Sequence, residues 1–235
     1  MNIGVVIPAA GRGTRMKMGK NKMYLELAGH PLLAHTVDIF YGHRAVDNIV
    51  IVVAEDEMEF CRERILKDYN FRNIDIVSGG ATRRESVFSG LQALGEVDTV
   101  LIHDGARPLL QFEVLEEILA ALKEFTALTA GRKVKDAIKV RDKNNFVRES
   151  LDRGNLVAVS TPQAFNYELI MKAHRNVSED IKIYDDASLV EELGGEVKII
   201  EDTYDNIKIT TPLDLEVAAY ILANRREKNE IGNRL

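Results

Sequence analysis

Short runs of apolar residues alternate with longer amphipathic stretches along most of the chain, and this alternation limits the folds available to it. Four runs rich in Val and Ile have the length and composition of buried strands, at residues 2–9, 48–54, 74–79 and 99–105. Stretches with helical periodicity lie between and after them, at 31–43, 55–69, 82–94 and 111–125. Because strands joined by helices form parallel pairs, the sequence predicts an α/β fold with a Rossmann-like, doubly wound and mostly parallel sheet.

The region 132–164 departs from this pattern because it has no long helix. Short extended pieces joined by polar turns predict a β arm over residues 132–160 that protrudes from the main sheet and is suited to pairing with a second subunit. Beyond it we expect helices at 166–176 and 185–194, strands at 196–202 and 206–210, and a last helix from Pro212. The sequence contains no repeat or low-complexity linker, so residues 1–235 are expected to form a single domain.

Charge is distributed unevenly, and its distribution excludes several classes of partner. The whole chain has a net charge of −6, yet its first acidic residue is Glu26, after five basic ones: Arg12, Arg15, Lys17, Lys20 and Lys22. A chain that is acidic overall lacks the broad positive field that duplex DNA or a membrane surface requires. No apolar run approaches the roughly 20 residues of a membrane-spanning helix. The local basic segment favours one small, densely anionic ligand.

Cysteine content and the N-terminal residues indicate the compartment. The single cysteine, Cys61, excludes an intrachain disulfide and a Cys-rich zinc site, and its charged helical surroundings favour an ordinary helix residue over a nucleophile. The first ten residues are apolar and lack the basic segment of a signal peptide. We therefore expect a cytoplasmic protein.

A glycine-rich loop, Pro8–Met16, follows directly after the first strand. Small residues at Ala9, Ala10, Gly11 and Gly13 would let the backbone approach a phosphate closely and donate its N–H groups to the oxygens. A dinucleotide-binding fingerprint is disfavoured, because Met16 stands where its third glycine belongs. A Walker A loop is disfavoured by the spacing of the glycines.

The remaining functional interpretation is a nucleoside-triphosphate loop whose cations lie just downstream. Arg15 and Lys22 would contact phosphate oxygens, whereas Lys17 and Lys20 are expected to be solvated. The alternative is a tight turn with solvated basic residues. Because five like charges within eleven residues repel one another, we expect the segment 12–22 to be mobile without ligand.

Several motifs, taken together and in order, resemble those of a known enzyme family. The loop Pro8–Met16 is the first, and the others are Ser78–Val87, His103–Pro108, Arg153 with Thr161–Gln163, Asp185–Glu191 and Asn206–Thr210. This series is similar to the 2-C-methyl-D-erythritol 4-phosphate cytidylyltransferases of the isoprenoid pathway. The resemblance implies transfer of CMP from CTP to 2-C-methyl-D-erythritol 4-phosphate with release of pyrophosphate. The attacking phosphate is largely a dianion at neutral pH, so no general base is expected.

The resemblance also implies a divalent metal, Mg²⁺, held by Asp104 and Asp205. Asp104 closes the predicted strand 99–105, and Asp205 precedes the predicted strand 206–210. Carboxylate oxygens suit Mg²⁺, which takes one or two of them together with substrate phosphates. Each aspartate has an alternative as a turn or capping residue. His103 is a rival ligand, but one histidine without a second at ligand spacing is more typical of a structural residue.

The remaining site residues are assigned by the same resemblance. Gly80, Ala81 and Ser86 would line the pyrimidine pocket for CTP, although Ser86 also fits a small helix residue behind a capping box of Thr82 and Glu85. Arg153 and Lys208 would orient the sugar phosphate, with Arg107 and Thr161 as weaker candidates. In the family the arm reaches across a dimer interface, so a homodimer is implied.

Two positions depart from the family pattern. Ala137 and Tyr184 stand where the family usually has threonine, and both belong by resemblance to the sugar-phosphate pocket. Two further hypotheses therefore stay open. One is cytidylyl transfer to another polyol phosphate such as ribitol 5-phosphate, although that relative usually has Gly-Gly where this chain has Ala9-Ala10. The other is a non-catalytic nucleotide-binding protein.

Overall fold

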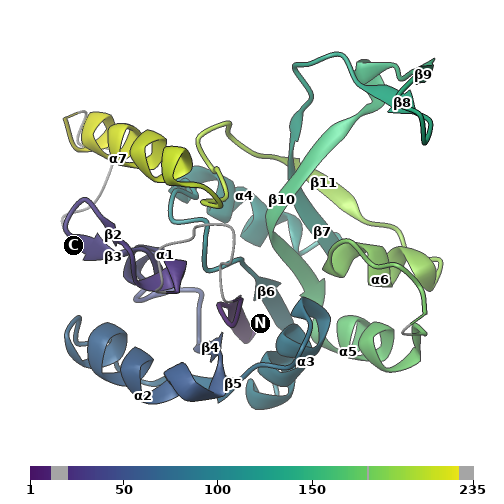
Figure 1. Cartoon of the computed structure of the whole chain (residues 1–235). Coiled ribbons are helices and arrows are strands. Elements are labelled where there is room, and N and C mark those ends of the chain that lie inside the picture. Colours follow the sequence, from purple (N-terminus) through teal and green to yellow (C-terminus); the bar gives the residue numbers. More distant parts are fainter. Residues whose placement is uncertain (12–20, 179, 228–235) are drawn as a thin grey trace.

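A seven-stranded sheet forms the centre of the computed structural model, which describes residues 1–11, 21–178 and 180–227 (Figure 1). The strands lie in the order β11-β7-β10-β6-β1-β4-β5. Neighbouring strands are parallel except at β10, which is antiparallel to both β6 and β7. The predicted mostly parallel, doubly wound sheet is confirmed. The strands are β1 (Ile3–Pro8), β4 (Asn48–Val53), β5 (Ile74–Ser78), β6 (Thr99–Ile102), β7 (Ala127–Lys133), β10 (Val157–Asn166) and β11 (Lys198–Glu201).

Helices cover both faces of the sheet, and each face has its own hydrophobic core. The helices of one core are α1 (Leu32–Phe40), α2 (Met58–Cys61), α4 (Phe112–Ala121) and α7 (Pro212–Glu227). The helices of the other are α3 (Arg83–Ala93), α5 (Tyr167–Asn176) and α6 (Asp186–Glu192). Along β1, Val5 and Ile7 belong to the first core and Val6 to the second. A strand covered on both faces explains the continuous apolar runs in the sequence.

The protruding arm is a separate hairpin of β8 (Lys139–Arg141) and β9 (Val147–Ser150), seen at the upper right of Figure 1. Asp142 closes its turn by accepting hydrogen bonds from the N–H groups of Asn144 and Phe146. The arm leaves Phe146 66% and Val147 62% exposed. Residues 132–133 and 157–160 still belong to β7 and β10, so the hairpin itself is shorter than the predicted arm.

Three local predictions need correction. Residues 206–210 form no ladder with any described strand, because this segment lies against the loop after β6, where the N–H of Ile209 donates to Ala106 O at 2.9 Å. Strand β7 begins at Ala127, ahead of the predicted extended region, because tertiary pairing with β10 and β11 overrides the low strand propensity of an Ala- and Gly-rich segment. The predicted helix at 55–69 is irregular, running from a 3₁₀ turn (Glu55–Glu57) through α2 into a π-helical turn (Arg62–Lys67).

The remaining short elements are a small hairpin and two 3₁₀ turns. The hairpin pairs β2 (Glu26–Leu27) with β3 (His30–Pro31), and the turns span Lys22–Tyr24 and Arg153–Asn155. Cys61 is fully buried, and burial raises the pKa of its thiol to about 12, as suits the predicted ordinary helix residue. Within the described ranges, no helix is long and apolar enough to cross a membrane.

Gly90 lets α3 lie close against the sheet, and this contact gives a stability test. A Cβ built at Gly90 would lie 2.5 Å from Val6 Cγ1 and 2.8 Å from Val52 Cγ2. We predict that Gly90→Ala lowers the free energy of unfolding by about 1–3 kcal/mol through overpacking, although alanine is intrinsically the better helix former. Urea denaturation measures this, with Gln92→Ala, an exposed position in the same helix, as the control. An unchanged or increased stability of Gly90→Ala would contradict the packing argument.

Candidate active site

A cavity of about 360 Å³ opens at the carboxyl ends of β1, β5 and β6. This is the edge at which doubly wound sheets bind their ligands. The lining comes from the loop after β1, the 3₁₀ turn at Lys22, the start of α3, the loop after β6, and the 206–210 segment. The residues are Pro8, Ala10, Gly11, Lys22, Met23, Gly80, Ala81, Thr82, Arg83, Ser86, Asp104, Gly105, Ala106 and Lys208.

The glycine-rich loop begins as an extension of the sheet. The N–H of Ala9 donates to Val52 O at 2.7 Å, and the N–H of Gly105 donates to Pro8 O at 3.1 Å. Ala9 is buried, whereas Ala10 and Gly11 line the cavity. The predicted phosphate contacts Gly13 and Arg15, and most of the segment expected to be mobile, lie outside the described residues.

Lys22 brings a positive charge into the wall of the cavity. Lys22 is only 7% exposed, and its ammonium donates to Ile209 O at 3.0 Å. Asn21 caps the turn by accepting a hydrogen bond from the N–H of Met23, and its own amide donates to Glu57. The turn thus holds Lys22 between the loop after β1 and the 206–210 segment.

The segment from Gly79 to Ser86 packs directly against the glycine-rich loop. A Cβ at Gly79 would lie 2.7 Å from both Ala10 Cβ and Ser86 Oγ, so glycine permits the close approach. The Thr82 half of the predicted capping box is confirmed, since Thr82 Oγ1 accepts from the N–H of Glu85 at 3.1 Å. Glu85 in turn accepts from the N–H of Ala81, one residue before the cap, at 2.8 Å. Ser86 Oγ donates to Thr82 O at 2.9 Å. Gly80, Ala81 and Ser86 therefore meet at one wall of the cavity.

Asp104 is held between two cations. Its Oδ1 accepts from Arg83 Nε at 3.1 Å, and its Oδ2 accepts from Lys208 Nζ at 2.6 Å. Burial opposes its ionisation, but the charges of Arg83 and Lys208 outweigh burial and hold the pKa of this carboxyl far below its usual range. Asp104 and Lys208, predicted as metal ligand and sugar-phosphate residue, are thus brought into contact.

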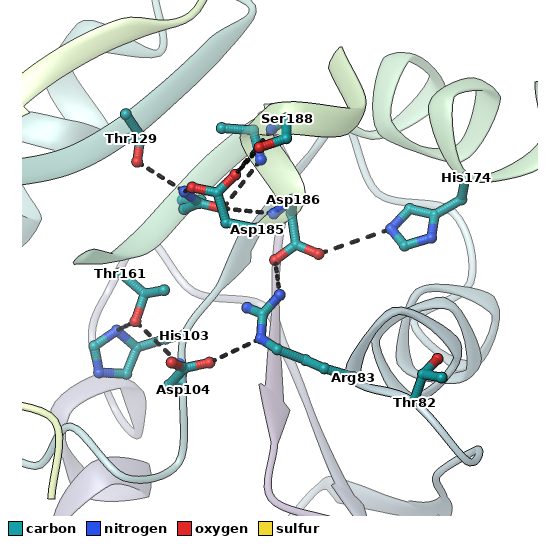
Figure 2. Close-up of polar contacts among 12 residues, drawn as sticks. Thr82, Arg83, His103, Asp104, Thr129, Thr161, His174, Asp185, Asp186 and Ser188 are labelled. Atoms are coloured by element: carbon teal, nitrogen blue, oxygen red, sulfur yellow. Dashed lines mark hydrogen bonds and ion pairs between the residues drawn. The ribbon is translucent and has the colours of Figure 1, made fainter. Parts of the chain in front are cut away.

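Arg83 is a site residue that the sequence reasoning missed. Its guanidinium also contacts Asp186, the first residue of α6, with Nη1 2.8 Å from Asp186 Oδ2 (Figure 2). Its position in the sequence could have indicated a role, because Arg83 is the first residue of a helix that begins shortly after a predicted strand. Capping explained the neighbours Thr82 and Glu85, so the arginine between them received no role.

His103 is engaged on both ring nitrogens. Nε2 lies 2.9 Å from Arg107 O, and Nδ1 lies 3.2 Å from Thr161 Oγ1, which in turn accepts from Asp104 N–H. Burial lowers the pKa of this imidazole to about 4. These contacts agree with the structural interpretation of His103, and they place Thr161 behind Asp104, outside the cavity lining.

Asp205 lies away from the cavity lining. Its carboxylate accepts from Arg225 Nη2 at 3.3 Å and from Gln111 Nε2 at 3.5 Å. Within the described part of the chain, no group of three or more His, Cys, Asp or Glu side chains could hold a metal ion. Mg²⁺ does not require such a group, because it uses one or two carboxylates, water and substrate phosphates. Asp104 supplies a hard oxygen donor of the kind Mg²⁺ takes, whereas the cations beside it suit the substrate phosphates.

The other predicted sugar-phosphate residues do not line this cavity. Arg107 is buried and donates to Asn206 O at 2.7 Å. Arg153 lies in the 3₁₀ turn between β9 and β10 and donates to Lys135 O at 2.8 Å. Ala137 and Tyr184, the two departures from the family pattern, are exposed.

The family model for 2-C-methyl-D-erythritol 4-phosphate cytidylyltransferase matches residues 3–224. The chain belongs to this family. It is therefore an enzyme of the nucleotidyltransferase class, and the non-catalytic hypothesis is set aside.

Individual relatives agree with the family model. The enzyme of that name from Bacillus licheniformis is 44% identical over 98% of this chain and 100% of its own length. The one from Clostridium novyi is 43% identical over 93% of this chain and 96% of its own length. Among solved structures, the 4-diphosphocytidyl-2C-methyl-D-erythritol synthase of Anaerococcus prevotii gives a TM-score of 0.84 at 33% identity, covering 94% of this chain and 96% of that one.

His174 gives the site region a predictable pH dependence. It is buried against Phe88, and its Nε2 lies 3.9 Å from Asp186 Oδ1 with no hydrogen-bond partner among the described residues. Burial, together with Arg84 and Arg83, lowers the pKa of His174 to about 4. Between its ordinary pKa of roughly 6.5 and this value, the unfolded chain binds a proton that the native state does not, so stability falls as pH falls.

We predict that His174→Phe removes this loss. The free energy of unfolding of the variant minus that of the unmodified protein should be about 2 kcal/mol larger at pH 5 than at pH 7, because only the unmodified protein loses stability through this histidine. Urea denaturation at both pH values measures the difference. The difference at pH 7 reports the change in packing alone and is subtracted from the difference at pH 5. An equal difference at the two pH values would show that His174 does not titrate as described.

Proposed function

We propose that this protein transfers CMP from CTP to 2-C-methyl-D-erythritol 4-phosphate, with release of pyrophosphate, in the non-mevalonate route to isoprenoid precursors. The observation that carries the proposal is the cavity at the sheet edge, whose wall holds Lys22, bonded to Ile209 O, and Lys208, bonded to Asp104. Membership in the cytidylyltransferase family supports the same reaction.

CTP would bind with its phosphates on the loop after β1 and its base against the start of α3. The N–H groups of Ala10, Gly11 and Gly13 are the proposed backbone donors, with Ala9 anchoring the loop. Arg15 and Lys22 are the proposed cations for the triphosphate. Gly80, Ala81 and Ser86 would read the pyrimidine through backbone groups and one hydroxyl, since a site built for one hydrogen-bond pattern rejects another.

The reaction requires alignment and charge neutralisation more than proton transfer. The acceptor phosphate attacks the α-phosphorus of CTP, and the bond from that phosphorus to the bridging oxygen breaks, releasing pyrophosphate. Lys22 and Arg15 would neutralise the charge that develops on the departing pyrophosphate. Asp104 is the proposed ligand for Mg²⁺, with Asp205 as the second proposed carboxylate. When bound, the ion would supply positive charge to the phosphate oxygens.

The acceptor would be held by Lys208 from the same subunit and by Arg153 from the arm of a second one. Lys208 lines the cavity, whereas Arg153 lies at the base of the hairpin away from it, so Arg153 would serve a neighbouring subunit. Arg107 and Thr161 would not touch the acceptor directly. Arg107 would stabilise the 206–210 segment through its bond to Asn206 O, and Thr161 would stabilise Asp104 by accepting from its backbone N–H. The exposed Ala137 and Tyr184 would then shape the acceptor pocket at a subunit interface.

The full proposal is a homodimeric, cytoplasmic enzyme with one domain over residues 1–235 and an arm over 132–160. The apolar side chains of the hairpin support an interface at the arm, since Phe146 and Val147 are exposed on a two-stranded ribbon. Nucleic acid and membranes are not proposed partners, because the chain has a net charge of −6.

Pyrophosphate release tests the function directly. We expect release with CTP, Mg²⁺ and 2-C-methyl-D-erythritol 4-phosphate, and at least tenfold slower release with UTP. Ribitol 5-phosphate and other polyol phosphates are assayed in parallel, because the residues at 137 and 184 differ from the usual threonines. Faster release with one of those acceptors would replace the proposed substrate, and no release with any acceptor would contradict the proposal.

The same assay tests the triphosphate contacts. Lys22→Met should lower turnover by roughly 10²–10³ at saturating CTP, because it removes charge stabilisation at the phosphates. Lys67→Met, which removes an exposed lysine paired with Glu63, is the matched control and should leave turnover unchanged. Equal turnover in the two variants would remove Lys22 from the mechanism.

The arm interface predicts a loss of assembly when a charge is introduced there. We expect Phe146→Glu to elute as a monomer in light-scattering chromatography, because burying an unpaired carboxylate in the interface is costly. Its turnover should also fall if Arg153 acts across subunits. Phe112→Glu, at another exposed phenylalanine, should leave the mass unchanged. A dimeric Phe146→Glu would place the interface elsewhere.

A further inference from the structure

Two carboxylates from different parts of the chain share one guanidinium. Arg83 lies with Nε 3.1 Å from Asp104 Oδ1 and with Nη1 2.8 Å from Asp186 Oδ2. Arg83 and Asp104 line the cavity, but Asp186 does not, and it is only 1% exposed. Asp186 therefore cannot touch a ligand in the cavity, and any effect on the reaction must pass through Arg83.

Asp186 is itself fixed by contacts that do not involve the cavity. Its backbone N–H donates to Gln163 Oε1 at 2.9 Å, at the start of α6. Gln163 is fully buried, and its amide donates to Thr129 Oγ1 and Asp185 Oδ2 at 2.8 and 2.9 Å. Through Gln163, the first turn of α6 is tied to β10 and β7, so the Asp186 carboxylate approaches Arg83 from a rigid support.

Arg83 is equally constrained on its own side. It is the first residue of α3, directly after the Thr82 cap. A guanidinium is planar, so the hydrogen bond from Nε to Asp104 and the ion pair of Nη1 with Asp186, at two different edges, together restrict its position and its plane. The Lys208 ammonium, the other cation on Asp104, is a point charge that fixes distance but not direction. The bridge to Asp186 thus determines how the Asp104 carboxylate is turned.

We propose that Asp186 is a positioning residue of this enzyme, which acts through Arg83 to orient the Asp104 carboxylate toward the bound triphosphate. The inference rests on the role proposed for Asp104. A buried acid that only stabilised the fold would change stability without changing turnover by the folded enzyme, and the experiment below separates the two.

The first experiment compares turnover with ligand binding. Asp186→Asn keeps the shape of the side chain and removes its charge, so we expect turnover to fall ten- to hundredfold, as when an outer partner of a metal ligand is lost. The dissociation constant for CTP without metal, measured by calorimetry, should stay within twofold. Glu192→Gln is the control, because Glu192 is an exposed acid of the same helix that takes no part in the contacts fixing Asp186, and its turnover should stay within twofold.

A double-mutant cycle with Arg83→Lys tests whether the two residues act as a unit. Lysine cannot bridge two carboxylates with a planar fork, so Arg83→Lys should also reduce turnover. The double variant should then be no slower than the slower single variant. Independent, multiplicative losses would overturn the proposal. If Asp186→Asn does not fold, the turnover of Arg83→Lys is tested by itself, and an unchanged turnover would overturn the proposal.

Nuclear magnetic resonance supplies a readout apart from activity. The Arg83 Nε–H, which donates to Asp104, should give a distinct and exchange-protected ¹⁵N signal in the ligand-free enzyme. That signal should move to the position of solvated arginines in Asp186→Asn and in Asp104→Asn, but not in Glu192→Gln. An unchanged signal in Asp186→Asn, or full turnover with only a lower melting temperature, would overturn the proposal. Absence of pyrophosphate release from the unmodified enzyme would instead contradict the proposed function.

Discussion

The carboxylate of Asp104 joins three segments that are far apart in the sequence. Arg83 reaches it from the start of α3, and Lys208 reaches it from the segment that follows β11. Without this carboxylate, two cations would face each other in a partly buried site, where their repulsion is screened far less than in water. The shape of the cavity therefore depends on a charge that is buried and compensated at the end of β6.

The reversal of one strand makes this arrangement compatible with the rest of the sheet. Because β10 runs antiparallel to β6, the chain passes the end of β6 on its way back from the arm and brings Thr161 within 3.1 Å of the Asp104 backbone N–H. The same reversal carries the hairpin of β8 and β9 away from the sheet (Figure 1). One topological feature thus supports both the back of the site and the arm proposed for assembly.

The sequence predicted most of what local periodicity and turn chemistry determine. The runs that became β1 and β4, the cap at Thr82 and the edge at which ligands bind all follow from residues close together in the chain. Strand β7 depends instead on its pairing with two neighbouring strands. The sequence of the 206–210 segment resembles that of a strand because apolar and polar residues alternate along it. Arg83 and Asp186 lie about a hundred residues apart, and only the fold shows that they meet.

The uneven charge of the chain also takes on a structural meaning. Among the described residues that line the cavity, three are cations, Lys22, Arg83 and Lys208, and one is a carboxylate, Asp104. A protein with a net charge of −6 thus carries a small positive concavity, which attracts a compact polyanion and leaves extended polyanions repelled by the surrounding surface. Asp104 and the buried Asp186, which pairs with Arg83, together compensate part of this positive charge, and the remainder favours the binding of phosphates. Asp104, which joins Arg83 and Lys208 at this wall, is then the acidic residue best placed to share a cation with the substrate.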